Sequence, residues 1–320
     1  MEVSGSLRRL AWQVWHWKFA LLASAGLGFI ALGIFLRSID HDREGGLLAV
    51  RYAAQWPVLA GVAAALAIVF YAGRRCWLCV GSIVVCLACT GAWCRVSWKD
   101  NLQQQPGENS ARFVYWNVAG PQARLGDVVA RAQSFAADFV AIGEAASESD
   151  AELAQWRAAF RGQTVLRLRG EMLVATRGVV RSTRYGSLRQ KGRYNLLELD
   201  LRGRHLRVLV VDFDADATRS RRTPFEALRE VVDANADQPL IVMGDFNTPA
   251  DSPHFKLLGG SLRDAWQTAG RGFSETWPVP LPMLRLDHVW ISKEVQPAAF
   301  RMDWSLLSDH RAQILEATLH

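Results

Sequence analysis

The sequence predicts a mixed α and β protein: two β-sheets packed on each other with helices outside, preceded by three transmembrane helices. Three long apolar runs lie within the first 98 of the 320 residues. After them come short apolar strands, some in hairpins and some separated by amphipathic helices. That mixture favours a two-sheet α/β sandwich of the α+β class over a doubly wound parallel sheet.

Residues 1–98 are predicted to form a membrane domain, because the apolar runs at about 18–36, 56–73 and 76–94 have roughly bilayer-spanning length. A cleaved signal peptide is the alternative for the first run, but no small-x-small site follows it. Tryptophans, which favour the headgroup layer, gather near the proposed helix ends. They are Trp12, Trp15, Trp17, Trp56, Trp77, Trp93 and Trp98.

All five cysteines belong to the third run. They are Cys76, Cys79, Cys86, Cys89 and Cys94. Two of the pairs have the C-x-x-C spacing that is found in metal sites. Thiolate ligands need a turn or knuckle, however, and these residues share one continuous apolar helix. We interpret them as side chains that pack helix against helix.

The distribution of basic residues predicts how the protein is oriented in the membrane. Because both sides would carry the same number of basic residues, the prediction depends on the first helix. One side would carry Arg8, Arg9, Lys18, Arg74 and Arg75, and the other Arg37, Arg43, Arg51, Arg95 and Lys99. The basic N-terminal flank and the tight Arg74–Arg75 turn suit the cytoplasm. The C-terminal domain is therefore expected to be extracytoplasmic.

Residues 99–112 are polar, contain Pro and Gly, and predict a linker to a C-terminal domain at 113–320. Periodicity in that domain predicts strands at 113–118, 138–144 and 171–177, a hairpin of 194–201 with 206–213, and helices at 125–135 and 224–235. Thr223, Pro224 and Glu226 have the spacing of a capping box for the last helix.

The net charge of +6 comes mostly from the membrane region, since residues 101–320 carry 27 basic and 26 acidic side chains. Within them, residues 152–207 hold thirteen basic and four acidic side chains, against eleven and sixteen in 208–320. A basic face beside an acidic one would hold a phosphate-bearing substrate over a metal site. The alternative is that these arginines are simply the outer faces of strands.

Polar side chains occur at five predicted strand ends, at Asn117, Glu144, Asp245 with Asn247, Asp287, and Asp309 with His310. In a strand the side-chain period is two, so Asp245 and Asn247 would share a face with the apolar Ile241 and Met243. Carboxylates gathered at one rim would repel one another unless a cation stood among them. With oxygen ligands and no Cys or His cluster, Mg²⁺ or Mn²⁺ is expected.

These motifs, "FVYWNV", "DFVAIGE", "MGDFNTP", "RLDHVWIS" and "SDHRAQIL", in this order, resemble those of the endonuclease/exonuclease/phosphatase (DNase I-like) superfamily. The resemblance covers about residues 113–319. It implies metal binding by Glu144, Asn117 and Asp309. It also implies that Asp245 orients or deprotonates the attacking water, that Asn247 holds the phosphate, and that His310, oriented by Asp287, contacts the scissile phosphate.

"SETWP" resembles the segment before the fourth motif, which implies that Thr276, Trp277 and Arg285 border the substrate cleft. One departure is "VVDFDAD", where many members have a His and Asp214 is nearest to that position. Asp214 is a candidate ligand for a second cation. Loss of an imidazole there could cost roughly 10²- to 10⁴-fold in rate.

The sequence thus predicts a membrane-anchored, Mg²⁺-dependent phosphoesterase, in the first place a phosphodiesterase. Its substrate is expected to be a lipid or head-group phosphodiester or a nucleic acid. The near-neutral domain disfavours strong duplex binding, and the three spans favour a lipid. No protein partner is predicted. The alternative is a catalytically silent relative that serves as a membrane-bound binding module.

Overall fold

The computed structural model describes residues 3–39, 45–105, 107, 109–118, 124–145 and 149–319, with side chains from Trp17 onward. Trp12, Trp15 and Arg43, which entered the membrane prediction, lie outside the described side chains. The chain divides into two compact units, Met1–Val96 and Ser97–His320.

The first unit is helical. Its helices are α1 (Val3–Ser38), α2 (Gly46–Ala53), α3 (Trp56–Ala72) and α4 (Cys76–Ser97). In the described part of the chain, Trp17–Ser38 and Cys76–Ser97 are long and apolar enough to cross a membrane. With 17 residues, α3 rises only about 25 Å, and it forms a third span only together with α2, from which it bends by 74°. The prediction of three spans is therefore not confirmed, because the second predicted run forms only the short helix α3.

Small residues let the helices of this unit approach closely. A Cβ at Gly33 would lie 2.7 Å from Ala54 Cβ, and one at Gly26 would lie 3.1 Å from Leu66 Cδ2. The buried Cys89 belongs to the same apolar cluster, with Cys79 and Cys86 packed against it. This packing agrees with the interpretation as helix-contact residues for Cys79, Cys86 and Cys89, whereas Cys76 and Cys94 are exposed.

The second unit contains two six-stranded mixed sheets, with strand orders β10-β12-β9-β8-β7-β6 and β13-β14-β2-β3-β5-β4, and a small β1-β11 sheet. The strands are β1 (Trp98–Asp100), β2 (Ser110–Asn117), β3 (Phe139–Gly143), β4 (Thr164–Leu168), β5 (Met172–Thr176), β6 (Val179–Ser187), β7 (Arg193–Leu201), β8 (Arg204–Asp212), β9 (Leu240–Asp245), β10 (Arg263–Asp264), β11 (Arg271–Phe273), β12 (Asp287–Ile291), β13 (Val295–Asp303) and β14 (Ala312–Leu319). The helices are α5 (Leu125–Ser134), α6 (Asp150–Ala159), α7 (Arg222–Asp233), α8 (Ala265–Ala269) and the 3₁₀ turn η1 (Pro253–Leu257).

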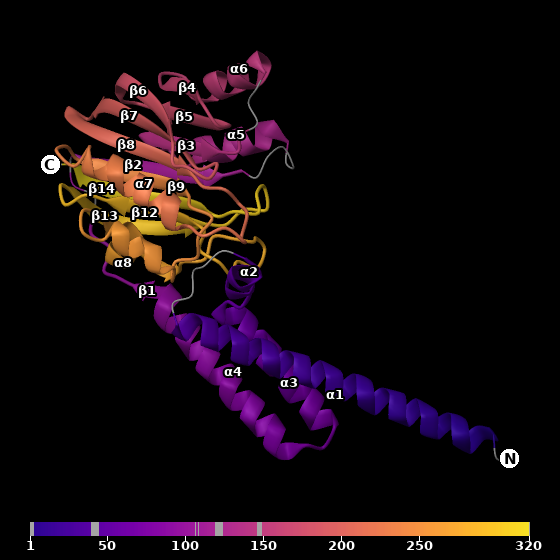
Figure 1. The fold of residues 1–320 in the computed structure, drawn as a ribbon. Helices are drawn as coiled ribbons and strands as arrows, with labels where there is room; N and C mark the ends of the chain where they lie inside the picture. The colour runs from indigo at the N-terminus through magenta and orange to yellow at the C-terminus, as the bar shows by residue number, and fades with distance from the viewer. Residues whose placement is uncertain are drawn as a thin grey trace. The chain divides into compact units, whose positions relative to one another are not determined.

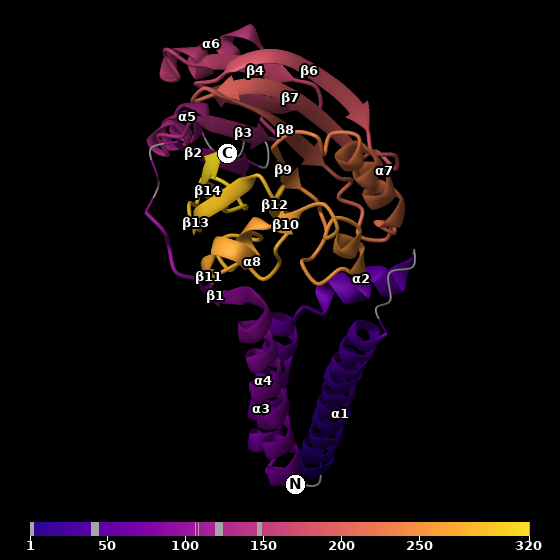
Figure 2. The same cartoon turned by 90° about the vertical axis from the view of Figure 1, so that its left-hand side faces the viewer.

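The two large sheets pack face to face, and helices cover both outer faces (Figure 1). The central core joins Phe113 and Phe139 of one sheet with Leu197, Val208 and Ile241 of the other. Separate apolar clusters lie under α5 and α6 on one outer face and under α7 and η1 on the other. Figure 2 shows α5 and α7 on opposite sides of the sandwich. The predicted two-sheet sandwich with outer helices is confirmed.

Two local predictions were wrong. Helix α7 begins at Arg222 with Arg221 in the N-cap position, and no side chain caps it, so Thr223 lies inside the first turn. Part of the segment predicted as a linker forms the strand β1, and β2 already begins at Ser110. β1 pairs with β11, which lies more than 170 residues later, and local sequence carries no sign of such a partner.

Candidate active site

Five strand termini with polar residues meet at one rim of the sandwich because of the strand pairing. β2 runs parallel to β3, which places Asn117 opposite Gly143. β12 is antiparallel to β9, which places Asp287 opposite Asp245. Tyr115 of β2, Met243 of β9 and Val289 of β12 lie in the core between the sheets. Asn117, Asp245 and Asp287 are each two positions away on the same strand, so their side chains also project inward at the rim.

Asn117 connects the two sheets at this rim. Its side-chain Nδ2 donates hydrogen bonds to Glu144 Oε1 and to Asp245 Oδ2, both at 3.0 Å. Glu144 follows the last residue of β3 and has a left-handed backbone with φ 50°. The amide of Asn117 therefore fixes the position of two carboxylates relative to each other.

Asp245 is almost completely buried at the end of β9. Its Oδ1 accepts a hydrogen bond of 2.8 Å from the backbone N–H of Asn247. Burial, followed by the charge of Asp287, raises the pKa of Asp245 well above its usual range. The side-chain Nδ2 of Asn247 donates to the backbone oxygen of Phe213 at 2.9 Å, which engages one of its two N–H groups. Asn247 therefore links the loop after β9 to the loop after β8, a contact that the sequence does not predict.

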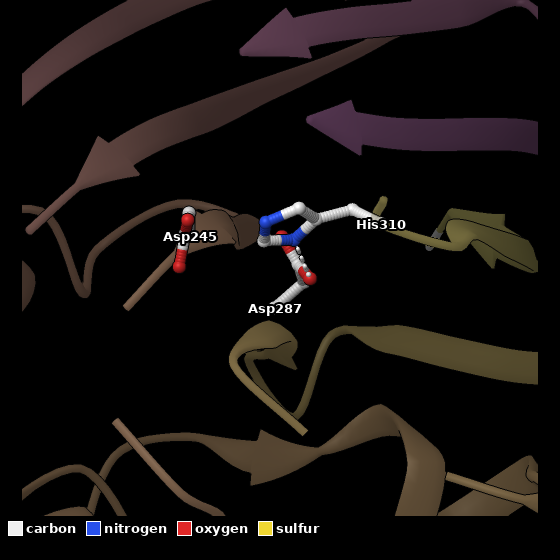
Figure 3. Close-up of side chains that lie close together, drawn as sticks. All are labelled: Asp245, Asp287 and His310. Atoms are coloured by element: carbon white, nitrogen blue, oxygen red, sulfur yellow. Dashed lines mark hydrogen bonds and ion pairs between the residues drawn. The ribbon is translucent and has the colours of Figure 1, made fainter. Parts of the chain in front are cut away.

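His310 and Asp287 form a buried pair beside Asp245 (Figure 3). The distance from His310 Nδ1 to Asp287 Oδ2 is 2.8 Å. Burial alone would lower the pKa of His310, but the charge and hydrogen bond of Asp287, with Asp245 and Asp309, raise it to about 10. The imidazole is thus held as a cation, with Nε2 as its second donor. Asp287 therefore lies where it can orient His310.

The backbone around this pair is fixed by groups outside it. Ser308 Oγ accepts from His310 N at 2.9 Å and donates to Asn117 O at 2.7 Å. Thr276 Oγ1 accepts from the backbone N–H of Asp287 at 3.2 Å, and Trp277 Nε1 donates to Asp309 Oδ2 at 2.9 Å. Thr276 and Trp277 thus position site residues.

Several carboxylate oxygens at this rim suit a cation. Asp287 Oδ1 and Asp309 Oδ1 are buried and accept no hydrogen bond from any described residue. One ligand atom each from Asp245, Asp287 and His310 lie within 4.8 Å of one another, a cluster that could hold a metal ion. Hard oxygen donors of this kind fit Mg²⁺ or Mn²⁺.

Arg285 and Asp214, both expected near the cleft, form ion pairs within the protein. Arg285 is buried in an ion pair with Asp264, with 2.6 Å between Nη2 and Oδ1, so it has no access to a substrate. Asp214 lies in the loop after β8, where its Oδ2 pairs with Arg219 Nη1 at 3.0 Å. Register places Asp212 rather than Asp214 beside Asp245.

The sequence reasoning missed two groups at the rim, the buried Tyr115 and the half-buried Asp212. Burial raises the pKa of Asp212 to about 6, although the Arg193 guanidinium opposes that rise. Burial, with the charges of Asp245, Asp287, Asp212 and Glu144, raises the pKa of the Tyr115 hydroxyl well above its usual range. Tyr115 precedes Asn117 by two positions, and that spacing on one strand face was the available signal.

An α/β/β/α sandwich with an Asp–His pair and further carboxylates at one rim defines a class of phosphoester-cleaving folds. The sequence model of the endonuclease/exonuclease/phosphatase family matches residues 114–310, and the chain belongs to this family. No curated protein sequence matches the chain.

Solved structures share the fold at low sequence identity. An endonuclease/exonuclease/phosphatase from Bacteroides vulgatus is 16% identical, with a TM-score of 0.56 over 67% of this chain and 100% of that one. The mannosyl-6-phosphatase Bt3783 of Bacteroides thetaiotaomicron is 14% identical, with a TM-score of 0.54 over 65% and 99%. TDP2 of D. rerio, complexed with a single-strand DNA product, is 14% identical, with a TM-score of 0.54 over 66% and 99%.

Proposed function

We propose that the protein is a membrane-anchored phosphodiesterase that uses Mg²⁺ or Mn²⁺ to hydrolyse a lipid, head-group or nucleic-acid phosphodiester. The observation that carries the proposal is the buried Asp287–His310 pair beside Asp245 at the rim. Structural neighbours include both a phosphatase and a DNA-bound TDP2, so the fold accommodates more than one phosphoester substrate.

Each residue has one task in the reaction. Asp245 in its anionic form takes a proton from the attacking water while the new P–O bond forms. His310, protonated and held by Asp287 through Nδ1, donates its Nε2–H toward the phosphate oxygens, where negative charge develops. The bond to the leaving oxygen then breaks, and that oxygen takes up a proton.

Glu144 and Asp309 are the residues we propose to hold the divalent cation, with Asn117 fixing Glu144. When bound, a divalent cation neutralises phosphate oxygens and lowers the pKa of bound water. Burial, followed by the charge of Asp287, raises the pKa of Asp245, and a cation held nearby would favour its anionic form.

The test uses the full-length protein in detergent with bis(p-nitrophenyl) phosphate and Mg²⁺ or Mn²⁺. Hydrolysis should disappear in EDTA and fall by about 10³-fold or more in Asp245→Asn and His310→Gln. His254→Gln is the matched control, because that imidazole packs against the Phe225 ring, 5.9 Å away. Activity that survives EDTA and both substitutions would overturn the proposal.

The catalytically silent alternative depends only on the His absent near Asp214. Asp245, Asp287 and His310 have a geometry that suits catalysis. The absence of a His near Asp214 therefore does not by itself favour a catalytically silent protein. Calorimetry that detects no Mg²⁺ binding would promote it.

Anchoring is proposed through Trp17–Ser38 and Cys76–Ser97, with α2 and α3 together as a third crossing, which would place the catalytic domain on the extracytoplasmic side of a cytoplasmic N-terminus. A reporter fused after residue 320 that is active only in the cytoplasm would refute that orientation. Plasmid DNA and phospholipid vesicles, assayed side by side with Mg²⁺, separate the two substrate classes.

A further inference from the structure

Four polar side chains form a row across adjacent strands of one sheet. The pairing places Asp287 of β12 opposite Asp245 of β9, Asp245 beside Asp212 of β8, and Asp212 opposite Arg193 of β7. Figure 2 shows these strands lying side by side. Strand neighbours in register point to the same face, so the row continues the site along the sheet.

Arg193 is the one cation in this row. It shares its strand face with Leu197 and Leu199 of the central core, so it points toward the space between the sheets. With strands spaced about 4.8 Å apart, its Cα lies about 10 Å from that of Asp245. A substrate that reaches Asp245 therefore passes within range of this guanidinium.

The Arg193 side chain is held in place, but only by part of its guanidinium. Its Nε donates to Asp212 Oδ2 at 2.7 Å. It also crosses the turn at Gly170, where a Cβ would lie 2.6 Å from Arg193 Cδ. Neither terminal nitrogen, Nη1 or Nη2, bonds to any described residue, and 34% of the side chain is exposed. A pre-oriented pair of donors therefore faces solvent at the rim.

The other arginines of this basic region differ from Arg193. Arg181 pairs with Asp200, and Arg184 and Arg207 pair with Glu198. Their acidic partners alternate with the core-facing leucines of β7 and lie on the opposite face of the sheet. For these arginines the outer-face interpretation holds.

We propose that Arg193 forms a subsite for a second phosphate group of the substrate, next to the phosphodiester that is cleaved. The planar fork of a guanidinium binds two phosphate oxygens at once, and Asp212 fixes the direction in which the fork points. This inference rests on the proposed function. It adds that substrates carrying an additional terminal phosphate are preferred. Both a nucleotide chain and a phosphorylated lipid head group have this chemistry.

The experiment uses the full-length protein and two matched substrate pairs. The nucleotide pair is thymidylyl-thymidine with and without a 5′-phosphate, and the head-group pair is glycerophosphoglycerol with and without a terminal phosphate. We expect the phosphorylated member of one or both pairs to have about tenfold higher kcat/KM. A preference in one pair alone identifies the source of the substrate.

Arg193→Gln should reduce this preference to near unity, and Arg193→Lys should retain part of it. Arg184→Gln is the matched control on the next strand and should leave the preference unchanged. If Arg193→Gln fails to fold because Asp212 loses its partner, the double variant Arg193→Gln with Asp212→Asn replaces it, since it also removes the charge of Asp212.

Binding of the same compounds in EDTA, measured by calorimetry, gives a readout that needs no turnover. If nothing is hydrolysed but the phosphorylated compounds bind about tenfold more tightly through Arg193, the subsite stands and the proposed function fails. If wild-type protein hydrolyses both members equally, or Arg193→Gln slows both by the same factor, the subsite is refuted and Arg193 is only structural.

Discussion

Replacing Asp287 by Asn removes the charged acceptor of the His310 hydrogen bond while preserving the shape of the side chain. A pKa of about 10 against an ordinary value of 6.5 corresponds to about 5 kcal/mol of preference for the charged imidazole, at about 1.36 kcal/mol per pKa unit. Asp287 is the largest favourable contributor. Losing it should destabilise the metal-free domain by about 3 kcal/mol, in line with other broken buried ion pairs.

The sign of the pH dependence follows from the raised pKa of His310. A group with a folded pKa above its unfolded value stabilises fully below the unfolded pKa, near 6.5, and this contribution disappears as the pH rises through about 10. The stability gap between wild type and Asp287→Asn should therefore be largest below pH 6.5. Urea unfolding of residues 97–320 in EDTA at several pH values measures this gap.

Catalysis should suffer more than stability. With His310 no longer held as a cation, kcat should fall by about 10²- to 10⁴-fold at unchanged protein concentration, with little change in KM. Asp264→Asn is the control, since it breaks the buried pair with Arg285 outside the site and should cost stability but not kcat. A wild-type kcat for Asp287→Asn, or a stability gap that grows with pH, would refute the assigned role of the pair.

Three further outcomes are expected. Gly244→Ala should destabilise the domain by about 3 kcal/mol or more in thermal unfolding, because φ is +155° and the new Cβ would lie 2.0 Å from Val211 O. Burial holds the pKa of His288 well below 6.5, so wild-type stability should fall below pH 6.5 more steeply than that of His288→Gln; parallel curves would contradict this. Residues 105–320 should unfold at a lower temperature than residues 97–320, because the pairing of β1 with β11 is lost; equal midpoints would show that β1 contributes nothing.

The sequence was sufficient for several of the strands and helices and for part of the site rim. Apolar alternation located β7 and β8, and polar residues at strand ends marked Asn117, Asp245 and His310, because local pattern determines which side chain a strand presents where it ends. The metal-facing and catalytic roles of these residues remain proposals.

What the sequence did not reveal depends on pairing between distant strands. Asp212 looks like one of three similar acids in "VVDFDAD", and only the β8–β9 register separates it from Asp214. Arg193 looks like one of many basic residues until β7 is placed beside β8. The burial of Arg285 likewise depends on Asp264, 21 positions away.

Enzymatic activity should also report whether the strands have paired correctly, because it depends on the row Asp287–Asp245–Asp212–Arg193. A slip of one residue in any of the three pairings would turn one of these side chains to the other face of the sheet. His310 lies 193 positions after Asn117, yet Ser308 bonds to the Asn117 carbonyl. A chain that has collapsed without docking its last strand would be compact but inactive, so recovery of turnover during refolding should follow that final docking step.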